Sequence, residues 1–463
     1  MNSSRTTQVL IVGAGPSGLT LALALLKNGI SVRIIEKESS VQVASRPLGI
    51  QPRSLENFLD LGVLSKMEIE HKYLADFTMH LYDDDKGVKP VKSWKFYEHE
   101  DPTPDTPLAN SVLMPKNRIE AVLRAPIEEY SCHVEFGTTL ASFEQHPDHV
   151  VASLIKTIDG KEMKEKAEFA WLVGADGGKG MVRKQLGLPF AGVTRNEGRF
   201  LLGEIHLKGL DVDGMHCWGN STSRSLMILP STADIFQYIG NGPDIDFDKV
   251  LSSHDTVRQF IREATGEKEL ELGKVEWATA YTVNVRMTTT FGSGRAFLVG
   301  DSAHVHSFTG GQGLNSGVQD AINLAWKIAL VSKGHASPSL LSTYSEERVP
   351  VISEMLKRTS HMLDNTLTKP TDVAWRRPKM LHLLGMHYRW SSIVLDEQKT
   401  VLTDEQKRDD VYGVDGDGHL RAGDRALDSI GLIDIASGTT RKLFELFGAS
   451  HHTVLVFASS MDA

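Results

Sequence analysis

The sequence predicts an α/β fold in which a parallel β-sheet is interrupted by an inserted, mainly antiparallel β-sheet domain. Residues 8–36 read as a buried strand, a glycine-rich turn, an apolar helix and a second β-branched strand, the order of a parallel crossover unit. Short segments of alternating polar and apolar residues between 199 and 281 indicate an antiparallel sheet. A strand at 295–299 then leads into a long helix at about 315–331, which returns the chain to the first sheet.

Length and composition bound the class of protein. The chain has 463 residues, enough for two or three domains of ordinary size. Acidic residues number 59 and basic residues 50, which gives a formal net charge of -9 without a long run of either sign. We therefore expect neither a nucleic-acid-binding groove nor a polybasic membrane patch.

The cysteine count and the apolar segments bear on where the protein acts. Only Cys132 and Cys217 are present, too few for a disulfide framework or a multi-cysteine metal site. No secretory signal precedes the first strand, and apolar runs such as 21–26 are far shorter than the ~20 residues of a membrane span. These observations predict a cytoplasmic protein without a metal site or a membrane segment.

Gly13, Gly15 and Gly18 form the pattern Gly-x-Gly-x-x-Gly directly between the first strand and the first helix. In a dinucleotide-binding turn, the first glycine permits the tight turn, the second lets a pyrophosphate approach the backbone, and the third allows close helix packing. Glu36 ends the next strand, where it could accept a hydrogen bond from a ribose hydroxyl. This register predicts that an adenine dinucleotide binds here, and the motif alone does not separate FAD from NAD.

Two later strands also end at acidic residues. A strand at 169–173 runs into Asp176, and the strand at 295–299 runs into Gly300, Asp301 and a glycine-rich loop at 310–313. Asp301 could hold a ribityl or ribose hydroxyl, and the loop could bring backbone amides against a flavin ring. Alternatively, both acids cap ordinary turns and the glycines form a plain loop.

Composition and periodicity place the remaining segments. Residues 73–107 are charged and lack sustained periodicity, so we expect them to leave the first sheet. Helical spacing is found near 118–123 and at 345–362. Residues 415–418 read as a turn or linker, and residues 452–458 as a strand without obvious partners.

These motifs, in this order, resemble the group A flavoprotein monooxygenases, the FAD-dependent aromatic hydroxylases. The resemblance extends over about residues 8–360 and includes VGADGG from residue 173, GRAFLVGDSAH from residue 294 and TGGQGLNSGVQDAINLAWKIALV from residue 309. LLSTYSEERVP from residue 340 is similar to the family's stretch after the long helix. LRAGDRALDS from residue 420 resembles the start of the thioredoxin-like C-terminal domain of the phenol hydroxylase branch, of which only about 45 residues are present.

The resemblance implies a division of the chain into domains. It implies a glutathione-reductase-type FAD-binding Rossmann domain, an inserted and mainly antiparallel substrate-binding domain, a helical segment and a truncated thioredoxin-like remnant. The FAD-binding domain is expected at 1–75, 105–195 and 285–360, the substrate-binding domain at 76–104 and 196–284, the helical segment at 361–414, and the remnant at 415–463.

The resemblance also implies the residues that hold FAD. Arg46 matches the family's arginine that reaches the FAD phosphates, and the loop that ends at Asn315 would lie along the isoalloxazine ring. Taken by itself, Arg46 or Arg118 is more often an ordinary solvated surface residue. The implied cofactor-binding residues are Gly13, Gly15, Gly18, Glu36, Arg46, Gly49, Arg118, Asp176, Asp301, Gly311, Gly313, Leu314 and Asn315.

The implied chemistry is aromatic hydroxylation. NADPH or NADH reduces FAD, oxygen then forms the flavin 4a-hydroperoxide, and this species delivers oxygen to an electron-rich, phenolic or polyketide-like ring. Tyr281 lies where the family often supplies a substrate-domain tyrosine, although a lone tyrosine is more often a packing residue. His304 and His306 invite a proton-relay interpretation, with structural histidines as the alternative. The expected partner is a small aromatic substrate, and a homodimer is left open.

Four departures from the family pattern keep other functions open. Leu48 stands where the phenol hydroxylase branch has a catalytic aspartate, and Lys116 replaces a usual glutamine. Gly180 replaces a usual serine, and Phe308 replaces a proline before the flavin loop. Phe308 could line the active site or pack beneath the loop. The alternatives are an epoxidase or decarboxylating hydroxylase of the same family, and a non-catalytic homologue that binds a flavin or another ligand.

Overall fold

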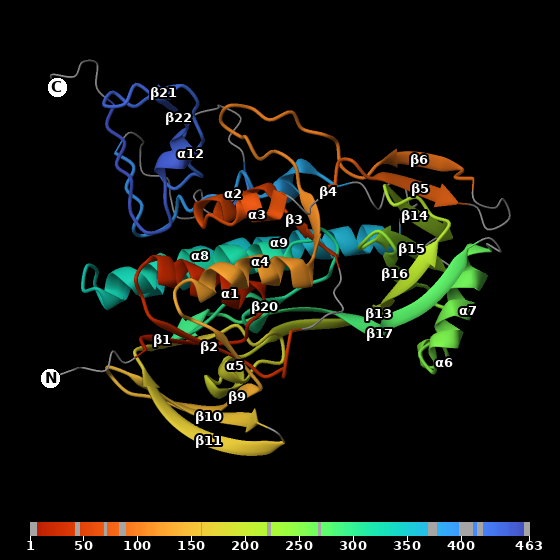
Figure 1. The fold of residues 1–463 in the computed structure, drawn as a ribbon, viewed down its shortest axis with the longest axis horizontal. Helices are drawn as coiled ribbons and strands as arrows, with labels where there is room; N and C mark the ends of the chain where they lie inside the picture. Colours follow the sequence, from red (N-terminus) through yellow and green to blue (C-terminus); the bar gives the residue numbers. More distant parts are fainter. Residues whose placement is uncertain are drawn as a thin grey trace.

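A six-stranded sheet forms the centre of the first part of the structure (Figure 1). Its strands are parallel except for the hairpin at one edge, which confirms the predicted crossover unit. The strands lie in the order β18 (Gly292–Ser293), β19 (Ala296–Leu298), β12 (Trp171–Gly174), β1 (Val9–Val12), β2 (Val32–Glu36) and β8 (Val134–Phe136).

The computed structural model of this chain describes residues 7–41, 47–68, 72–82, 89–158, 160–219, 224–266, 270–368, 377–397, 411–413 and 420–457.

Helices cover one face of the central sheet and a small antiparallel sheet covers the other (Figure 1). All four residues of β1 are buried, and the helix that follows is buried through most of its length, so both elements are apolar on every side. The helical face contains α1 (Pro16–Lys27), α4 (Lys116–Glu128), α8 (Gly313–Ser332) and α9 (Ser342–Thr368), and the antiparallel sheet contains β9 (Thr138–Gln145), β10 (Val150–Ile158) and β11 (Lys161–Phe169).

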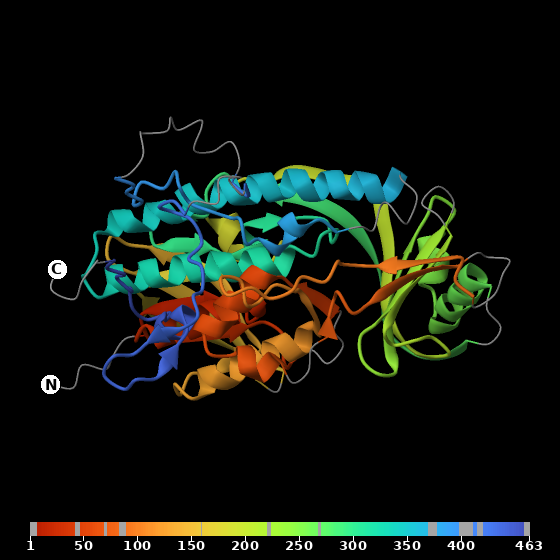
Figure 2. The same ribbon diagram turned by 90° about the horizontal axis from the view of Figure 1, so that it is seen from above.

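A second, eight-stranded sheet extends away from the central sheet, as Figure 2 shows. Two long antiparallel strands of this sheet, β13 and β17, extend from the first domain to the far end of the molecule, so they join the two parts. Apart from the parallel pair β14–β5, its strands are antiparallel. The order is β20 (His304–Val305), β17 (Glu271–Met287), β13 (Ala191–Lys208), β16 (Ile235–Asn241), β15 (Ser225–Pro230), β14 (Gly214–Gly219), β5 (Thr78–Tyr82) and β6 (Lys92–Lys95).

The helices of this second part have clear start and stop signals. Ser253 caps α7 by accepting from the backbone N–H of Thr256, whose hydroxyl accepts from Ser253 in return, and Gly266 ends the helix in the left-handed conformation. The apolar side of α7 packs into the sheet's core. The helices are α6 (Phe247–Val250) and α7 (His254–Thr265).

A further antiparallel sheet of three strands, called the third sheet below, contributes Leu48, Gly49 and Leu113 to the lining of the cavity between the two larger sheets. Its strands are β3 (Pro47–Ile50), β7 (Val112–Pro115) and β4 (Lys72–Tyr73), and the remaining short elements before the C-terminal segment are α2 (Pro52–Asp60), α3 (Leu64–Glu68), α5 (Met181–Gln185), η1 (Gly300–Ser302), η2 (Pro338–Leu341) and η3 (Lys379–His382).

The helical segment predicted at 361–414 is largely wrong for the described residues. Helix α9 continues to Thr368, and the only other helical residues described there form η3. Pro378 directly precedes η3 as its N-cap residue. Its ring nitrogen carries no hydrogen, so it cannot donate the backbone hydrogen bond of a helix interior. The chain then lies along α9, where Trp390 Nε1 donates to Glu346 O at 3.0 Å and Ser391 Oγ donates to the carboxylate of Glu347 at 2.7 Å. Side-chain bonds to α9 replace internal helical bonds in this segment.

The C-terminal residues form a small, mostly exposed unit on the first domain. Arg425 and Glu56 form a buried ion pair of 2.7 Å, which attaches this unit to α2. The strand predicted at 452–458 is wrong, because residues 452–457 are exposed and have no regular structure, and an isolated strand cannot pair its backbone groups. That residues 415–463 are a thioredoxin-like remnant stays a prediction. The unit contains β21 (Leu432–Ile433), β22 (Thr440–Arg441) and α12 (Leu443–Leu446).

Within the part of the chain that the structure describes, no helix combines the length and apolar character that a membrane span requires.

A buried histidine in the eight-stranded sheet makes the stability of the protein depend on pH. His216 is 1% exposed; its Nε2 lies 2.9 Å from Asp211 O and its Nδ1 lies 2.7 Å from the hydroxyl of Tyr82. The carbonyl must accept from Nε2–H, so Nδ1 accepts from Tyr82 and the ring is neutral. Burial lowers the pKa of His216 to about 4, and the stacked ring of His80 acts in the same direction, against Asp211.

We expect this neutral histidine to destabilise the fold in acid. The unfolded chain binds a proton near pH 6.5 but the folded chain only near pH 4, so stability is fully present above pH 6.5 and falls as pH decreases through this window. The loss reaches about 3 kcal/mol at pH 4. Urea unfolding of His216→Gln should depend less on pH between 6.5 and 4 than unfolding of the unaltered protein, whereas the exposed control His99→Gln should not differ. Equal pH dependence in all three proteins would contradict this.

Candidate active site

The first glycine turn divides into positions that the fold requires and one position that it leaves open. Gly13 has φ +108°, and a Cβ there would lie 2.3 Å from Ala175 O. A Cβ on Gly18 would lie 2.1 Å from Gly13 O. Gly15, in contrast, has no other heavy atom within 4 Å of its Cβ position. Because Gly15 precedes the N-terminus of α1, the open position offers unpaired N–H groups and a positive dipole end to a phosphate.

Glu36 closes this turn from the neighbouring strand. Its Oε2 accepts from the backbone N–H of Ala14 at 3.0 Å, and its Oε1 accepts from the N–H of Glu38 at 3.1 Å. The carboxylate therefore lies at the carboxyl end of β2, directly beside the glycine turn. This is the placement that the sequence predicts for a ribose-binding acid, and the role itself stays a prediction.

Asp176 follows the strand on the other side of β1 and caps the short helix α5. Its Oδ2 accepts from Val182 N–H at 3.0 Å, and burial raises its pKa against the opposing effect of these backbone bonds. A Cβ at Gly180 would lie 2.2 Å from Asp176 Oδ1, which explains the glycine where the family has serine. Arg183 joins this turn to the next by donating to Gly178 O and Ser302 O at 2.7 and 2.8 Å.

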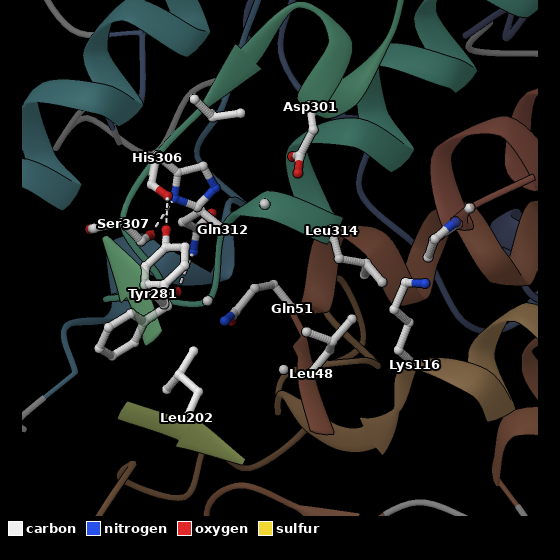
Figure 3. A pocket seen from close by; sticks show the side chains of 18 of the residues that line it. Leu48, Gln51, Lys116, Leu202, Tyr281, Asp301, His306, Ser307, Gln312 and Leu314 are labelled. Carbon is white, nitrogen blue, oxygen red and sulfur yellow. Dashed lines mark hydrogen bonds between the residues drawn. The ribbon is translucent and has the colours of Figure 1, made fainter. Parts of the chain in front are cut away.

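Asp301 presents an exposed carboxylate at the third strand end. Gly300 precedes it with φ +59°, which lets the chain turn sharply after β19. Figure 3 shows the Asp301 side chain pointing into an open space bordered by Leu314 and Lys116. The three strand ends, at Gly13, Asp176 and Asp301, are thus brought to one edge of the sheet, where α/β proteins bind ligands.

A buried ionic cluster holds the turn that presents Asp301. Asp320 of α8 is fully buried and accepts from Gly300 N–H at 3.0 Å, His304 Nε2 at 2.7 Å and Arg348 Nε at 2.7 Å. Burial alone would raise the pKa of Asp320, but the charge of Arg348 and the bonds from His304 and Arg348 hold it below its usual value. His304 is therefore a structural residue.

The glycine-rich loop is tied to the small third sheet through one asparagine. Gly311 has φ +61°, so a larger residue would strain the loop. Asn315 is buried; its Nδ2 donates to Gly311 O at 2.7 Å and Gly49 O at 2.9 Å, and its Oδ1 accepts from Gln51 N–H at 2.8 Å. Asn315 thus supports the loop from behind and does not itself line the cavity.

A cavity of about 890 Å³ lies between the strand ends of the central sheet and the eight-stranded sheet. Its volume lies within the range of cofactor and substrate pockets. One side is formed by the glycine turn, Asp301 and the loop, and the other by apolar residues of the eight-stranded sheet, of the third sheet and of the segments beside them (Figure 3). The apolar side includes Leu48, Leu74, Phe96, Leu113, Leu202, Met215, Met227, Leu229, Ile239 and Phe308.

The predicted site residues fall into four groups. Arg46 lies outside the described residues. Arg118 is exposed on α4 and does not line the cavity, whereas Lys116, two residues earlier, does, and it pairs with Glu120 at 2.6 Å. The residues that support the turns and the loop without lining the cavity are Gly13, Gly18, Glu36, Asp176 and Asn315. Those that line the cavity are Gly15, Gly49, Tyr281, Asp301, Gly311, Gly313 and Leu314.

Tyr281 and Phe308 form an aromatic corner of the cavity beside the loop. The Tyr281 hydroxyl donates to His306 O at 3.3 Å, and its ring lies edge-on to Phe308 with 6.2 Å between centroids (Figure 3). Phe308 also packs edge-on against Phe200 at 4.7 Å. Of the two sequence alternatives for Phe308, the structure shows the first, because Phe308 lines the cavity, and its ring packs on the eight-stranded sheet.

Large apolar and aromatic residues of the eight-stranded sheet divide between the cavity and the core. Met227 of β15 lines the cavity. Trp218, Phe236 and Tyr238 are fully buried in the core of the eight-stranded sheet. Three lining residues that sequence reasoning missed are Gln51, Tyr97 and Arg377, which follow no recognisable motif.

Residues 6–359 of the chain match the FAD-binding domain family. The chain belongs to this family. A flavin-dependent monooxygenase of Mycobacteroides abscessus is 33% identical over 456 residues, which cover 97% of this chain and 88% of that protein. The 6-methylpretetramide 4-monooxygenase of Streptomyces rimosus is 34% identical, over 76% of this chain and 61% of its own length.

A solved structure confirms the fold of this flavoprotein. The flavin-dependent monooxygenase PieE, solved with FAD and substrate, superposes with a TM-score of 0.80 at 21% identity, covering 96% of this chain and 84% of that one. The predicted combination of an FAD-binding domain with an antiparallel substrate domain is therefore confirmed. The protein is an FAD-dependent monooxygenase of the aromatic hydroxylase type, with NAD(P)H as reductant.

The residues present fit FAD. The open position at Gly15 fits the pyrophosphate, the Asp301 carboxylate fits the ribityl hydroxyls, and the loop before α8 offers backbone N–H groups to the ring. Glu36 would receive the adenosine ribose. These individual contacts remain predictions.

Two glycine substitutions should separate the cofactor role from the folding role. Gly15 has φ -73°, which alanine adopts, so Gly15→Ala should keep the melting temperature of the FAD-free protein within about 2 °C. Its methyl group would occupy the pyrophosphate position and weaken FAD binding on the order of tenfold or more.

Gly18→Ala should instead lower the free energy of unfolding by about 1–3 kcal/mol, because its methyl group meets the backbone at Gly13. Fluorescence titration with FAD and thermal unfolding of both variants measure the two effects. Unchanged FAD affinity in Gly15→Ala would remove this position from the cofactor site.

Proposed function

We propose that this monooxygenase hydroxylates a fused-ring, polyketide-like phenol. The observation that carries the proposal is the cavity, whose flavin side is polar and whose opposite side is apolar and aromatic. A volume of about 890 Å³ gives room for a planar ligand larger than a single ring beside the loop. The Streptomyces relative, which by its name acts on 6-methylpretetramide, supports the same substrate class.

The cofactor and the protein chain would have different roles in the reaction. Bound FAD, reduced by NAD(P)H, would supply oxygen activation. The chain holds the cofactor at the strand ends through Gly15 and Asp301, and it orients the substrate ring between the loop and the sheet. Phe308, Leu202 and the other apolar wall residues would exclude water from the reacting ring.

Tyr281 is the residue that we assign to the phenolic proton. Leu48 lines the cavity and carries no group that could accept a proton, so the aspartate route of the phenol hydroxylase branch is absent at this position. Tyr281 lines the cavity and its hydroxyl donates to His306 O, and a phenolic oxygen can also accept a hydrogen bond from a substrate hydroxyl. Tyr281 would thereby polarise the phenol and not carry a full negative charge.

The proposal includes the cellular location of the protein. We propose a cytoplasmic location, because both cysteines are buried and unpaired. Epoxidation, oxidative decarboxylation or ligand binding without oxygen transfer are outcomes that the following experiment distinguishes.

The proposed function is tested on the purified holoenzyme. NADPH and NADH oxidation are followed in air with a panel of hydroxylated anthraquinones and naphthacenes. The molecular masses of the products are measured by mass spectrometry. A product that is heavier by one oxygen and shows a new phenolic hydroxyl in its NMR spectrum supports the proposal, since an epoxide has the same mass. An epoxide or a product that has lost CO2 supports the family alternatives. Bound FAD without stimulation by any compound of this class contradicts the proposal.

Asp301→Ala should remove most of the FAD that copurifies, since the ribityl chain loses its acceptor. The matched control is Asp101→Ala, whose carboxylate is 99% exposed and lies away from the cavity lining. The ratio of flavin absorbance to protein absorbance measures the loss. Full retention of FAD by Asp301→Ala would refute the assigned role of Asp301.

Tyr281→Phe should slow product formation by about a hundredfold, the lower end of the range for loss of an acid–base group, with FAD content and substrate affinity unchanged. The matched control is Tyr130→Phe, an exposed tyrosine outside the cavity lining. A reduced affinity with an unchanged maximal rate would instead assign Tyr281 to packing against the substrate.

A further inference from the structure

A cationic side chain and a phenol lie together on the substrate wall of the cavity. Arg377 and Tyr97 both line it, and the Arg377 guanidinium lies over the Phe96 ring, 5.3 Å from its centroid. Tyr97 is 5% exposed, edge-on to Phe96 at 5.2 Å and stacked on His382 at 5.8 Å. The pair therefore belongs to the aromatic side of the cavity and not to the glycine turn.

The position of Tyr97 is fixed relative to the flavin loop. Gln51 is 1% exposed; its Nε2 donates to the Tyr97 hydroxyl oxygen at 3.4 Å and its Oε1 accepts from Ser111 at 2.6 Å. The backbone N–H of Gln51 donates to Asn315, which also binds the loop at Gly311. Since Gln51 supplies the donor to the Tyr97 oxygen, the Tyr97 O–H can donate to a ligand.

The charges around the cavity favour an anion at this wall. Among the described lining residues Asp301 is the single carboxylate, whereas Lys116, Lys179, Arg286 and Arg377 are cationic. Burial lowers the pKa of Arg377 to about 10, partly offset by Tyr97, so the guanidinium stays charged at neutral pH. Burial raises the pKa of Tyr97, which therefore stays protonated. A charged donor and a neutral donor at one apolar wall match an acidic oxygen.

We propose that Arg377 and Tyr97 form an oxyanion-recognition site that binds an acidic oxygen of the aromatic substrate. This site rests on the proposed function and narrows it to aromatic compounds that carry an ionised phenol or a carboxylate. The planar guanidinium presents two parallel donors to such a group, which a lysine at the same place would not. Binding there fixes the orientation of the ring between the loop and the eight-stranded sheet.

The test uses FAD-loaded protein and two pairs of probes that differ in the acidic oxygen. The pairs are alizarin with its dimethyl ether, and anthraquinone-2-carboxylate with its methyl ester. Titration monitored by the visible flavin spectrum gives dissociation constants. The unaltered protein should bind the acidic member of at least one pair tenfold or more tightly than the neutral member. Preference within the alizarin pair identifies a phenolate site, and preference within the other pair a carboxylate site.

Arg377→Gln should lose that preference: the dissociation constant of the acidic probe should rise about tenfold, and that of the neutral probe should stay within twofold. Arg377→Lys should restore part of it, and Tyr97→Phe should lose a smaller part. The matched control is Lys379→Gln. Lys379 lies two residues after Arg377, and its exposed side chain pairs with Glu100 outside the cavity, so this variant removes the same charge at a different place. This control should bind all probes like the unaltered protein.

Three results would overturn the proposal. Equal weakening of acidic and neutral probes in Arg377→Gln would show a packing role. Loss of FAD from Arg377→Gln would assign the arginine to the cofactor. Absence of any acidic preference in the FAD-loaded, unaltered protein would refute the substrate class while leaving the monooxygenase function intact, whereas absence of FAD itself would refute the proposed function.

Discussion

The buried carboxylate of Asp320 is the contact on which the arrangement of the site depends. It joins the long helix α8 to the Gly300 turn, to His304 in the first strand of the eight-stranded sheet, and to Arg348 in α9. Removing one partner of such a pair leaves an uncompensated charge in the interior, which costs about 3–5 kcal/mol. Because these bonds meet at one point, the turn that presents Asp301 cannot move independently of the helices or of the second domain.

The two domains share their structure along the cavity. Strands β13 and β17 pair over most of their length and reach from the flavin side to the substrate wall. Asn315 makes the corresponding link on the other side, between the loop and the β3 strand that carries Leu48 and Gly49. Substrate wall and cofactor side are thus positioned by continuous backbone, and a packed core of this kind transmits a displacement directly.

The departures from the family pattern have structural consequences that differ from one another. Gly180 gives Asp176 the space to cap α5, so this change is compensated locally. Phe308 joins an edge-on aromatic group with Phe200 and Tyr281 and makes the cavity wall more apolar. Leu48 removes a proton acceptor and has no local replacement, which gives the polar residues elsewhere on the wall a larger share in recognising the substrate.

The sequence by itself determined the parts of the protein that depend on neighbours along the chain. The turn at Gly13, the crossover to Glu36, the Gly300 turn and the loop before α8 are local motifs, because backbone geometry and helix N-termini impose the same residues wherever they occur. The fold followed from these motifs, and FAD as the cofactor followed from the family resemblance that they carry together. The irregular path after α9 was not predictable in this way, since its bonds go to side chains of another element.

Only the tertiary structure decided which residues form the substrate wall. Gln51, Tyr97 and Arg377 are separated by up to 326 positions and come from three different segments, so no spacing along the chain relates them. Likewise Met227 faces the cavity while Trp218 and Tyr238 face the core, a choice set by which face of the twisted sheet each residue occupies. A turn or a helix N-terminus depends on consecutive residues and can be recognised in the sequence. A cavity is formed by side chains from distant segments, which only long-range packing brings together.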